Sequence, residues 1–131
     1  MVEVLRKEVD CEFEMAVARV EQAIIDEGFT VLLSKSIHGV LKEKLGIENY
    51  PKYTFVLACG PEIAKAAIEV SKDVGTLFPC SFAVYEENES VFVSHTPLME
   101  VAAEVGLATK EAMAPVVEMT TAATKAVWSR F

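Results

Sequence analysis

The feature that most constrains this fold is an apolar run that passes directly into a helix signal. Residues Tyr53–Cys59 are almost all apolar, aromatic or β-branched, which predicts a strand that is buried on both faces. Gly60 and Pro61 follow at once, and proline favours the first turn of a helix. Apolar residues then recur at helical spacing as far as Gly75. The sequence therefore predicts a strand–helix unit in the middle of the chain.

Short strands and helices alternate on both sides of this unit, without a linker or an internal repeat. The predicted strands outside it are 4–13, 29–34, 80–85 and 90–94, and the predicted helices are 14–27, 36–45, 97–105 and 109–131. Strands mixed with helices and one hairpin predict a single α+β domain over residues 1–131. Its expected form is a two-layer sandwich, with helices packed on a mostly antiparallel sheet of about five strands.

Charge and composition exclude several classes of partner. The chain has 131 residues, of which 52% are hydrophobic, and this is enough for one ordinary core. Its net charge is −8 and no Lys/Arg cluster stands out, so neither a nucleic acid nor an anionic membrane is an expected partner. No apolar run approaches the roughly 20 residues that span a bilayer, and the N-terminus does not resemble a signal peptide. An odd number of cysteines fits reduced thiols, so we expect a cytoplasmic protein.

Two cysteines are the strongest candidates for a functional site. Cys59 stands where the central strand ends and a helix begins, a position at which α/β folds gather ligands and which stabilises a thiolate. Gly60 would allow a ligand or another backbone to approach closely. Cys80 opens the next predicted strand, so the chain path could return it beside Cys59. Two adjacent thiols could bind a soft metal ion, relay sulfur or form a reversible disulfide, whereas the alternative is that both are buried packing residues.

The remaining polar candidates carry weaker signals. His38 and His95 lie far from the cysteines in sequence and show no ligand spacing, so a complete zinc site is not predicted. We expect His95 to be a surface or capping residue, and Cys11 to fill space in the core or on the surface. No nucleotide-binding or hydrolase motif is present, so the catalytic residues stay unknown.

The last predicted helix is apolar around its circumference. Val116, Met119, Val127 and Trp128 lie on different sides of it. Such a helix needs cover on more than one side, and a second copy of the chain is one way to supply it. This pattern favours a homodimer.

These residues resemble the core of a known family, DUF302. The resemblance is carried by the Cys59-Gly60-Pro61 turn and by Phe78-Pro79-Cys80, where Phe78 stands in place of the family's leucine; it also extends to Phe82–Glu86 and to Thr96–Met99. It covers nearly the whole chain. It implies a compact α+β fold that often forms a homodimer, and it pairs Cys59 with Cys80, but it implies no settled activity.

Three functional hypotheses remain open. The first is a binding or redox module in which Cys59, Gly60, Pro61 and Cys80 form a site for a soft metal, sulfur or a small ligand. The second is a structural or interaction homodimer whose cysteines only pack. The third is an enzyme with a pocket at the Cys59–Gly60 turn, which ranks last because no nucleophile–base pair is visible beside it.

Overall fold

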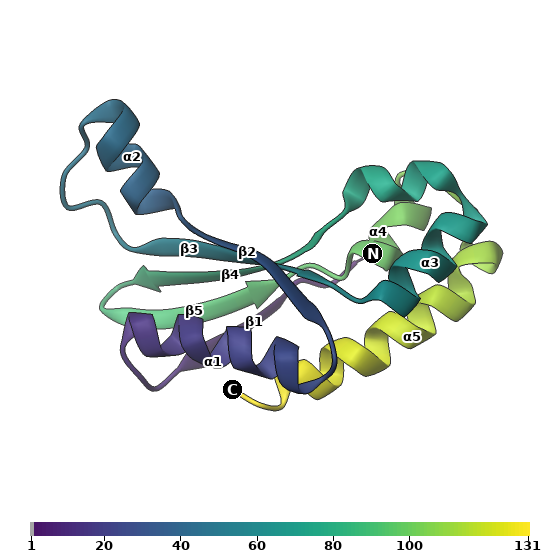
Figure 1. Ribbon diagram of the computed structural model, residues 1–131, viewed down its shortest axis with the longest axis horizontal. Helices are drawn as coiled ribbons and strands as arrows, with labels where there is room; N and C mark the ends of the chain where they lie inside the picture. The colour runs from purple at the N-terminus through teal and green to yellow at the C-terminus, as the bar shows by residue number, and fades with distance from the viewer. Residues whose placement is uncertain (1) are drawn as a thin grey trace.

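The computed structural model describes residues 2–131 as a five-stranded sheet flanked by helices on one face and at one end (Figure 1). All neighbouring strands are antiparallel, and their order across the sheet is β1-β5-β4-β3-β2. The strands are β1 (Leu5–Val9), β2 (Thr30–Ser36), β3 (Tyr53–Cys59), β4 (Cys80–Glu87) and β5 (Ser90–His95). The predicted α+β class with an antiparallel sheet of five strands is confirmed.

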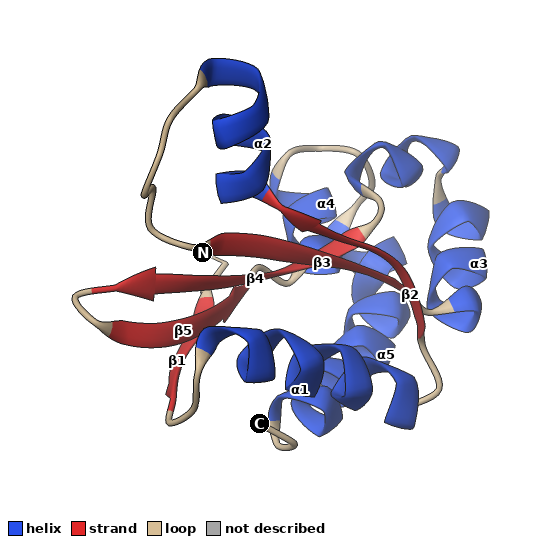
Figure 2. Ribbon diagram, turned by 60° about the vertical axis from the view of Figure 1, so that its left-hand side comes forward, coloured by secondary structure: helices blue, strands red, loops and turns tan. Residues whose placement is uncertain are grey.

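The helices fall into three groups around this sheet. They are α1 (Phe13–Asp26), α2 (Ile37–Leu45), α3 (Pro61–Val70), the 3-10 helix η1 (Lys72–Leu77), α4 (Leu98–Glu104) and α5 (Lys110–Trp128). Helix α1 lies along one face of the sheet, and α2 projects from the far end of β2 and β3 (Figures 1 and 2). Helices α3, η1, α4 and most of α5 gather at the opposite end, and we call this group the helical lobe. No helix within residues 2–131 has the length and apolarity to cross a membrane.

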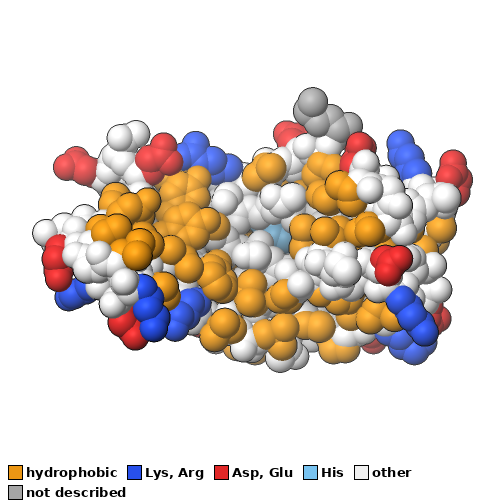
Figure 3. All heavy atoms as spheres, turned by 90° about the horizontal axis from the view of Figure 1, so that it is seen from above, with side chains coloured by type: hydrophobic (Ala, Val, Ile, Leu, Met, Phe, Trp, Pro, Cys, Tyr) orange, Lys and Arg blue, Asp and Glu red, His pale blue; other side chains and the backbone are white. Residues whose placement is uncertain are grey.

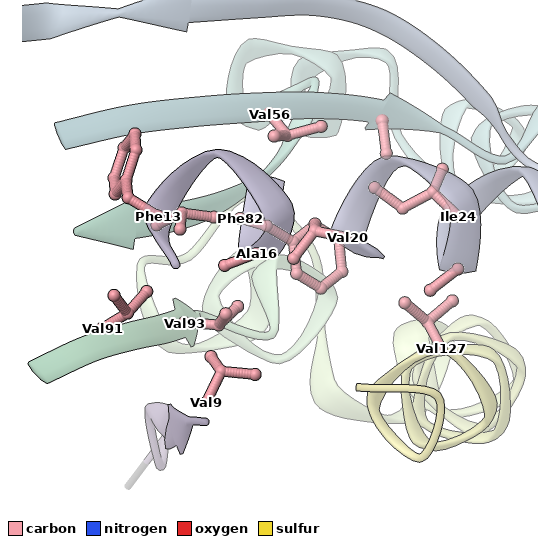
Figure 4. Close-up of a cluster of buried hydrophobic side chains, with 13 residues drawn as sticks. Val9, Phe13, Ala16, Val20, Ile24, Val56, Phe82, Val91, Val93 and Val127 are labelled. Carbon is pink, nitrogen blue, oxygen red and sulfur yellow. The ribbon is translucent and has the colours of Figure 1, made fainter. Parts of the chain in front are cut away.

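The first hydrophobic cluster fills the space between the sheet and α1. Val20 and Ile24 of α1 are fully buried against Val56 of β3 and Phe82 of β4, and Val127 reaches the same cluster from the end of α5 (Figure 4). The inward positions of β3, β4 and β5 alternate with outward ones, as expected for a sheet with one covered face. We refer to this group as the sheet cluster.

The second hydrophobic cluster lies inside the helical lobe. Met99 and Ala102 of α4 pack with Met113 and Val116 of α5, while Ala67 joins from α3. Small residues let the helices approach closely, and the two methionines fill the irregular space between them. We refer to this group as the helical cluster.

Helix boundaries follow local capping signals. The Ser36 hydroxyl accepts a hydrogen bond from the Gly39 amide at 3.0 Å and caps α2, which ends at Gly46 in the left-handed conformation. Thr109 caps α5 in the same way by accepting from the Ala112 amide. Pro115 therefore lies inside α5 and does not delay its start. The helix after Pro61 ends at Val70 rather than near Gly75, because η1 takes over at residue 72.

The prediction that Tyr53–Cys59 is buried on both faces is wrong. Only Thr54, Val56 and Ala58 face the core, whereas the alternate side chains are half-buried or exposed. No helix of the described residues 2–131 covers this second face of the sheet, which we call the open face (Figure 1). The run has few polar residues because its outward positions hold aromatic and aliphatic side chains.

Aromatic rings form a row across the open face. Tyr53, Tyr85 and Phe92 stack from strand to strand, with centroids 5.7 and 5.8 Å apart, and the Arg6 guanidinium lies 4.0 Å from the Phe92 centroid. Seen from above, hydrophobic side chains spread over this side of the molecule from the α2 end to the helical lobe (Figure 3). Leu33, 48% exposed, belongs to the same face because it pairs with Leu57.

The C-terminal helix is covered within the chain over part of its circumference. Helix α5 packs on α1, α3 and α4, which bury Met113, Val116, Thr120 and Val127, whereas Met119 is 38% exposed. Trp128 packs on the sheet cluster and makes an edge contact with Phe131. The homodimer itself stays a prediction.

Candidate functional site

Cys59 and Gly60 lie where the sheet meets the helical lobe. Cys59 ends β3, and Gly60 is the residue before the first turn of α3, in which Pro61 occupies the first position. A Cβ atom on Gly60 would lie only 2.8 Å from Cε1 of Phe29, so the close approach at this glycine is to an aromatic ring. Glycine is required here by space and not by backbone conformation, since its φ is −101°.

The strand register brings Cys80 next to Cys59. Cys80 begins β4, after a cis peptide bond between Phe78 and Pro79, and its direct partner across the ladder is Ala58. Cys59 is the residue after Ala58 on β3, so Cys59 and Cys80 are diagonal neighbours on adjacent strands. Both thiols are half-buried and unoxidised. The antiparallel pairing of β3 with β4, rather than a parallel crossover, produces this proximity.

Both cysteines line one cavity of about 240 Å³, which we call the outer cavity. Leu32 and Ile63 form part of its wall, and Phe78 and Met99 close it on the side of the helical lobe. None of the described residues that line it carries a charge. The outer cavity is therefore suited to an uncharged, largely apolar occupant.

The environment keeps the Cys80 thiol protonated. Burial raises the pKa of Cys80, because the thiolate loses solvation, and the neighbouring Cys59 sulfur raises it further. Cys80 is therefore a neutral, polarizable sulfur at neutral pH and not an activated nucleophile.

His95 is the functional candidate that sequence reasoning missed. It was expected at the surface or in a cap, but it is 3% exposed and stacks on Phe82 with ring centroids 4.3 Å apart. Its Nδ1 donates a hydrogen bond to the Ser81 carbonyl at 2.9 Å. Burial lowers the pKa of His95, so the imidazole is held neutral. Alternation along β5 was the available signal, since Val91, Val93 and His95 share the inward face.

His95 opens onto a second, smaller cavity of about 50 Å³, which we call the inner cavity. The two cavities share Ala58, Gly60, Ile63 and Cys80 as lining residues, so they adjoin each other. Within residues 2–131, Nε2 of His95 is the only buried side-chain nitrogen or oxygen without a hydrogen-bond partner. Because it has no partner, it also makes no hydrogen bond to the Cys80 sulfur, and the two do not form a nucleophile–base pair here.

The other polar candidates lie away from these cavities. His38 stands at the start of α2, where its Nδ1 accepts from the Tyr53 amide at 3.0 Å. Cys11 packs on the sheet cluster before α1. Glu87 in the β4–β5 hairpin pairs with Arg6 at 3.2 Å on the surface. Wider grooves elsewhere on the molecule contain neither Cys59 nor Cys80.

The described part of the chain contains no cluster of three or more His, Cys, Asp or Glu side chains that could hold a metal ion. Cys59 and Cys80 would supply two ligands at most, so a metal would need further ligands from outside the chain. The assignment of a metal to these two residues stays a prediction.

Fold and cavities together define a small antiparallel α+β domain with an apolar pocket at one end of its sheet. Residues 5–127 match the model of the family described as domain of unknown function DUF302, so the chain belongs to that family. A solved structure with the same arrangement is that of an uncharacterized conserved DUF302 protein from Bacillus stearothermophilus. It is 23% identical, with a TM-score of 0.77, and the match covers 95% of this chain and 97% of the other. A search of curated proteins finds no match. The resemblance noted from the sequence is confirmed, and the solved structure supports the fold alone.

Proposed function

We propose that the protein is a binding module that takes up a small, uncharged and largely apolar ligand in the outer cavity, beside Cys59 and Cys80. The observation that carries the proposal is that both thiols line the same apolar cavity, although they come from strands joined through a helix. We place this module in the cytoplasm, where reducing conditions keep such thiols free.

Size and polarity support a small organic ligand. An apolar cavity of roughly 150 Å³ accepts benzene, so about 240 Å³ is room for a substituted ring or a short branched chain. The neutral Cys80 thiol suits such a ligand, because sulfur packs well against aromatic and aliphatic groups. An anionic ligand would find no cation among the described residues of the wall.

Protection of the thiols from alkylation tests the proposal. With toluene as the probe, we expect iodoacetamide to label Cys59 and Cys80 of the native protein more slowly, while Cys11 keeps its rate. Cys11 is a control within the chain because it is also half-buried but lines neither cavity. Ala64→Phe should remove the protection by filling the outer cavity, whereas Ala112→Phe on exposed α5 surface should not. Unchanged labelling rates for all three cysteines would count against the proposal.

A soft metal ion or a redox step would use the same two thiols. Metal ligation requires thiolates, and the raised pKa of Cys80 opposes this unless the metal itself displaces the proton. Metal content and free-thiol count of freshly purified protein, beside Cys59→Ser and Cys80→Ser, test this ligand class. Metal that disappears in both variants would favour it over a small organic ligand. An enzymatic role ranks below both because Cys80 and His95 make no hydrogen bond.

The open face of the sheet favours a homodimer as a second function. Its aromatic row and Leu33 form an apolar surface that no helix within residues 2–131 covers, and a second copy is the occupant that the family resemblance implies. We expect a dimer at micromolar concentration by light scattering, and we expect Leu33→Glu to weaken it. Trp128→Glu should act through stability and not through the interface, since Trp128 packs within its own chain. A clean monomer would contradict this second proposal.

A further inference from the structure

We infer that the ligand carries one hydrogen-bond donor, a hydroxyl or an N–H group, which enters the inner cavity and is bound by Nε2 of His95. This inference rests on the proposed function, because it concerns the same pair of cavities. It narrows the ligand from any small apolar molecule to an uncharged molecule with an apolar body and a terminal donor.

The protonation state of His95 follows from its single hydrogen bond. The Ser81 carbonyl can only accept, so the nitrogen 2.9 Å from it, Nδ1, carries the hydrogen. In a neutral imidazole the other nitrogen then has a free lone pair. Nε2 is therefore an acceptor, and it faces a ligand that can donate.

The rest of the site holds this nitrogen in place. The imidazole stacks on Phe82, directly across the β4–β5 ladder, and the bond to Ser81 fixes the orientation of the ring. Thr120, which also lines the inner cavity, already donates its hydroxyl to the Val116 carbonyl at 2.9 Å. Nothing in the described chain donates to Nε2, and a buried acceptor without a donor is costly.

The dimensions of the two cavities divide the ligand into a head and a body. The inner cavity, about 50 Å³, is too small for a ring but large enough for a hydroxyl or an amine-type N–H group. The outer cavity, about 240 Å³, holds the apolar body, and Cys80 and Ile63 lie on the boundary that both share. Since no described residue lining either cavity is charged, a carboxylate or a phosphate head would be disfavoured.

A pair of probes of equal shape tests the donor. The pair is 4-methylphenol, which has a hydroxyl donor, and para-xylene, which has a methyl group in the same place. A third probe, 4-methylanisole, has an oxygen that cannot donate a hydrogen bond. In the unmodified protein 4-methylphenol should bind more tightly than para-xylene. We expect this ratio of affinities to fall about three- to tenfold in His95→Phe, which is the range for one hydrogen bond. The matched control is His38→Phe, which changes the other histidine, outside both cavities, and should leave the ratio unchanged.

A measurement on the unmodified chain avoids dependence on how His95→Phe folds. In ¹⁵N spectra of the imidazoles, the chemical shift of His95 Nε2 should move toward the value of a hydrogen-bonded nitrogen when 4-methylphenol is added. It should not move with para-xylene or 4-methylanisole. A resonance that stays in place, or an affinity ratio that His95→Phe does not change, would overturn the inference while leaving the apolar pocket standing. Absence of binding by all three probes would overturn the proposed function and this inference together.

Discussion

The sheet cluster and the helical cluster are built in different ways. The sheet cluster is mostly valine with two phenylalanines, and about half of it lies on strands that are held by ladder hydrogen bonds, while α1 supplies most of the rest. The helical cluster combines methionine, alanine and valine on helices that meet through side chains alone. Rigid, β-branched packing leaves little room for adjustment, whereas methionine adapts its shape. The two cavities lie where these two kinds of packing meet: Phe82 and Val127 border the inner one, and Phe78 and Met99 border the outer one.

This difference explains the position of the candidate site. Close-packed interiors have few voids. A void is expected at the boundary between the two clusters, because side chains there must pack against both a twisted sheet and a group of helices. Cys59 and Cys80 lie on this boundary because β3 ends there and β4 begins there. The following predictions test the contrast between the two clusters and the boundary between them.

Truncation inside each cluster should give the largest effect. Ile24→Ala removes a fully buried side chain from the rigid sheet cluster, and we expect a loss of roughly 4 kcal/mol in the free energy of unfolding. Met113→Ala in the helical cluster should cost less, roughly 2 to 3 kcal/mol, because the helices can close part of the void. Urea unfolding measures both, and a larger loss for Met113→Ala would reverse the comparison.

A methyl group at the boundary should give the next largest effect. Gly60→Ala places a Cβ atom 2.8 Å from the ring of Phe29, so the ring must move; we expect about 1 to 3 kcal/mol of destabilisation. Gly75→Ala in η1 is the matched control, since no atom lies within 4 Å of its added Cβ, and it should stay within about 0.5 kcal/mol. Equal effects of the two substitutions on the thermal midpoint would contradict this.

His95 should make stability depend on pH in a defined direction. Burial lowers the pKa of the folded His95, so as the pH falls below about 6.5 the unfolded chain takes up the proton first. The folded state therefore loses stability between that pH and the lower folded pKa, with a slope of at most about 1.4 kcal/mol per pH unit from this group. In His95→Phe this slope should be missing from unfolding curves measured at a series of pH values, with the carboxylate contribution unchanged. Identical pH profiles would show that His95 is not held neutral.

Removal of helix caps should give the smallest loss of stability, and this loss should differ between α5 and α2. Thr109→Ala uncaps α5, which carries residues of both clusters, and should cost about 1 kcal/mol. Ser36→Ala removes the same type of bond from α2, which has no buried residue, so fraying of this helix should leave global stability nearly unchanged. Hydrogen exchange would locate the second effect in α2, and a global loss as large as that of Thr109→Ala would contradict it.

Sequence patterns predicted the elements well where the signal is local. The Ser36 and Gly46 caps, the strand Tyr53–Cys59 and the start of α3 at Pro61 all depend on neighbouring residues, and each appears as expected. The burial of β3 was misjudged, because an apolar outward face and an inward face have the same composition. Only the position of the helices decides which face is covered.

The site was predicted in part for the same reason. The cysteines could be placed near one another from the chain path, but the cavities depend on how α4 and α5 pack at the end of the sheet, which no local pattern encodes. His95 was assigned to the surface because its neighbours Thr96 and Pro97 indicate a helix start. The period-two pattern of Val91 and Val93 places it inside, and this longer-range signal is the one that decides burial.

Helix α5 has a mechanical consequence that follows from its two attachments. Its first half, with Met113 and Val116, belongs to the helical cluster, and its last turns, with Val127, belong to the sheet cluster. Because one continuous rod of 19 residues is anchored in both, neither half of the molecule can loosen without disturbing the other. The two clusters should therefore unfold together in one cooperative transition. A ligand bound at their boundary should stabilise α5 along its whole length.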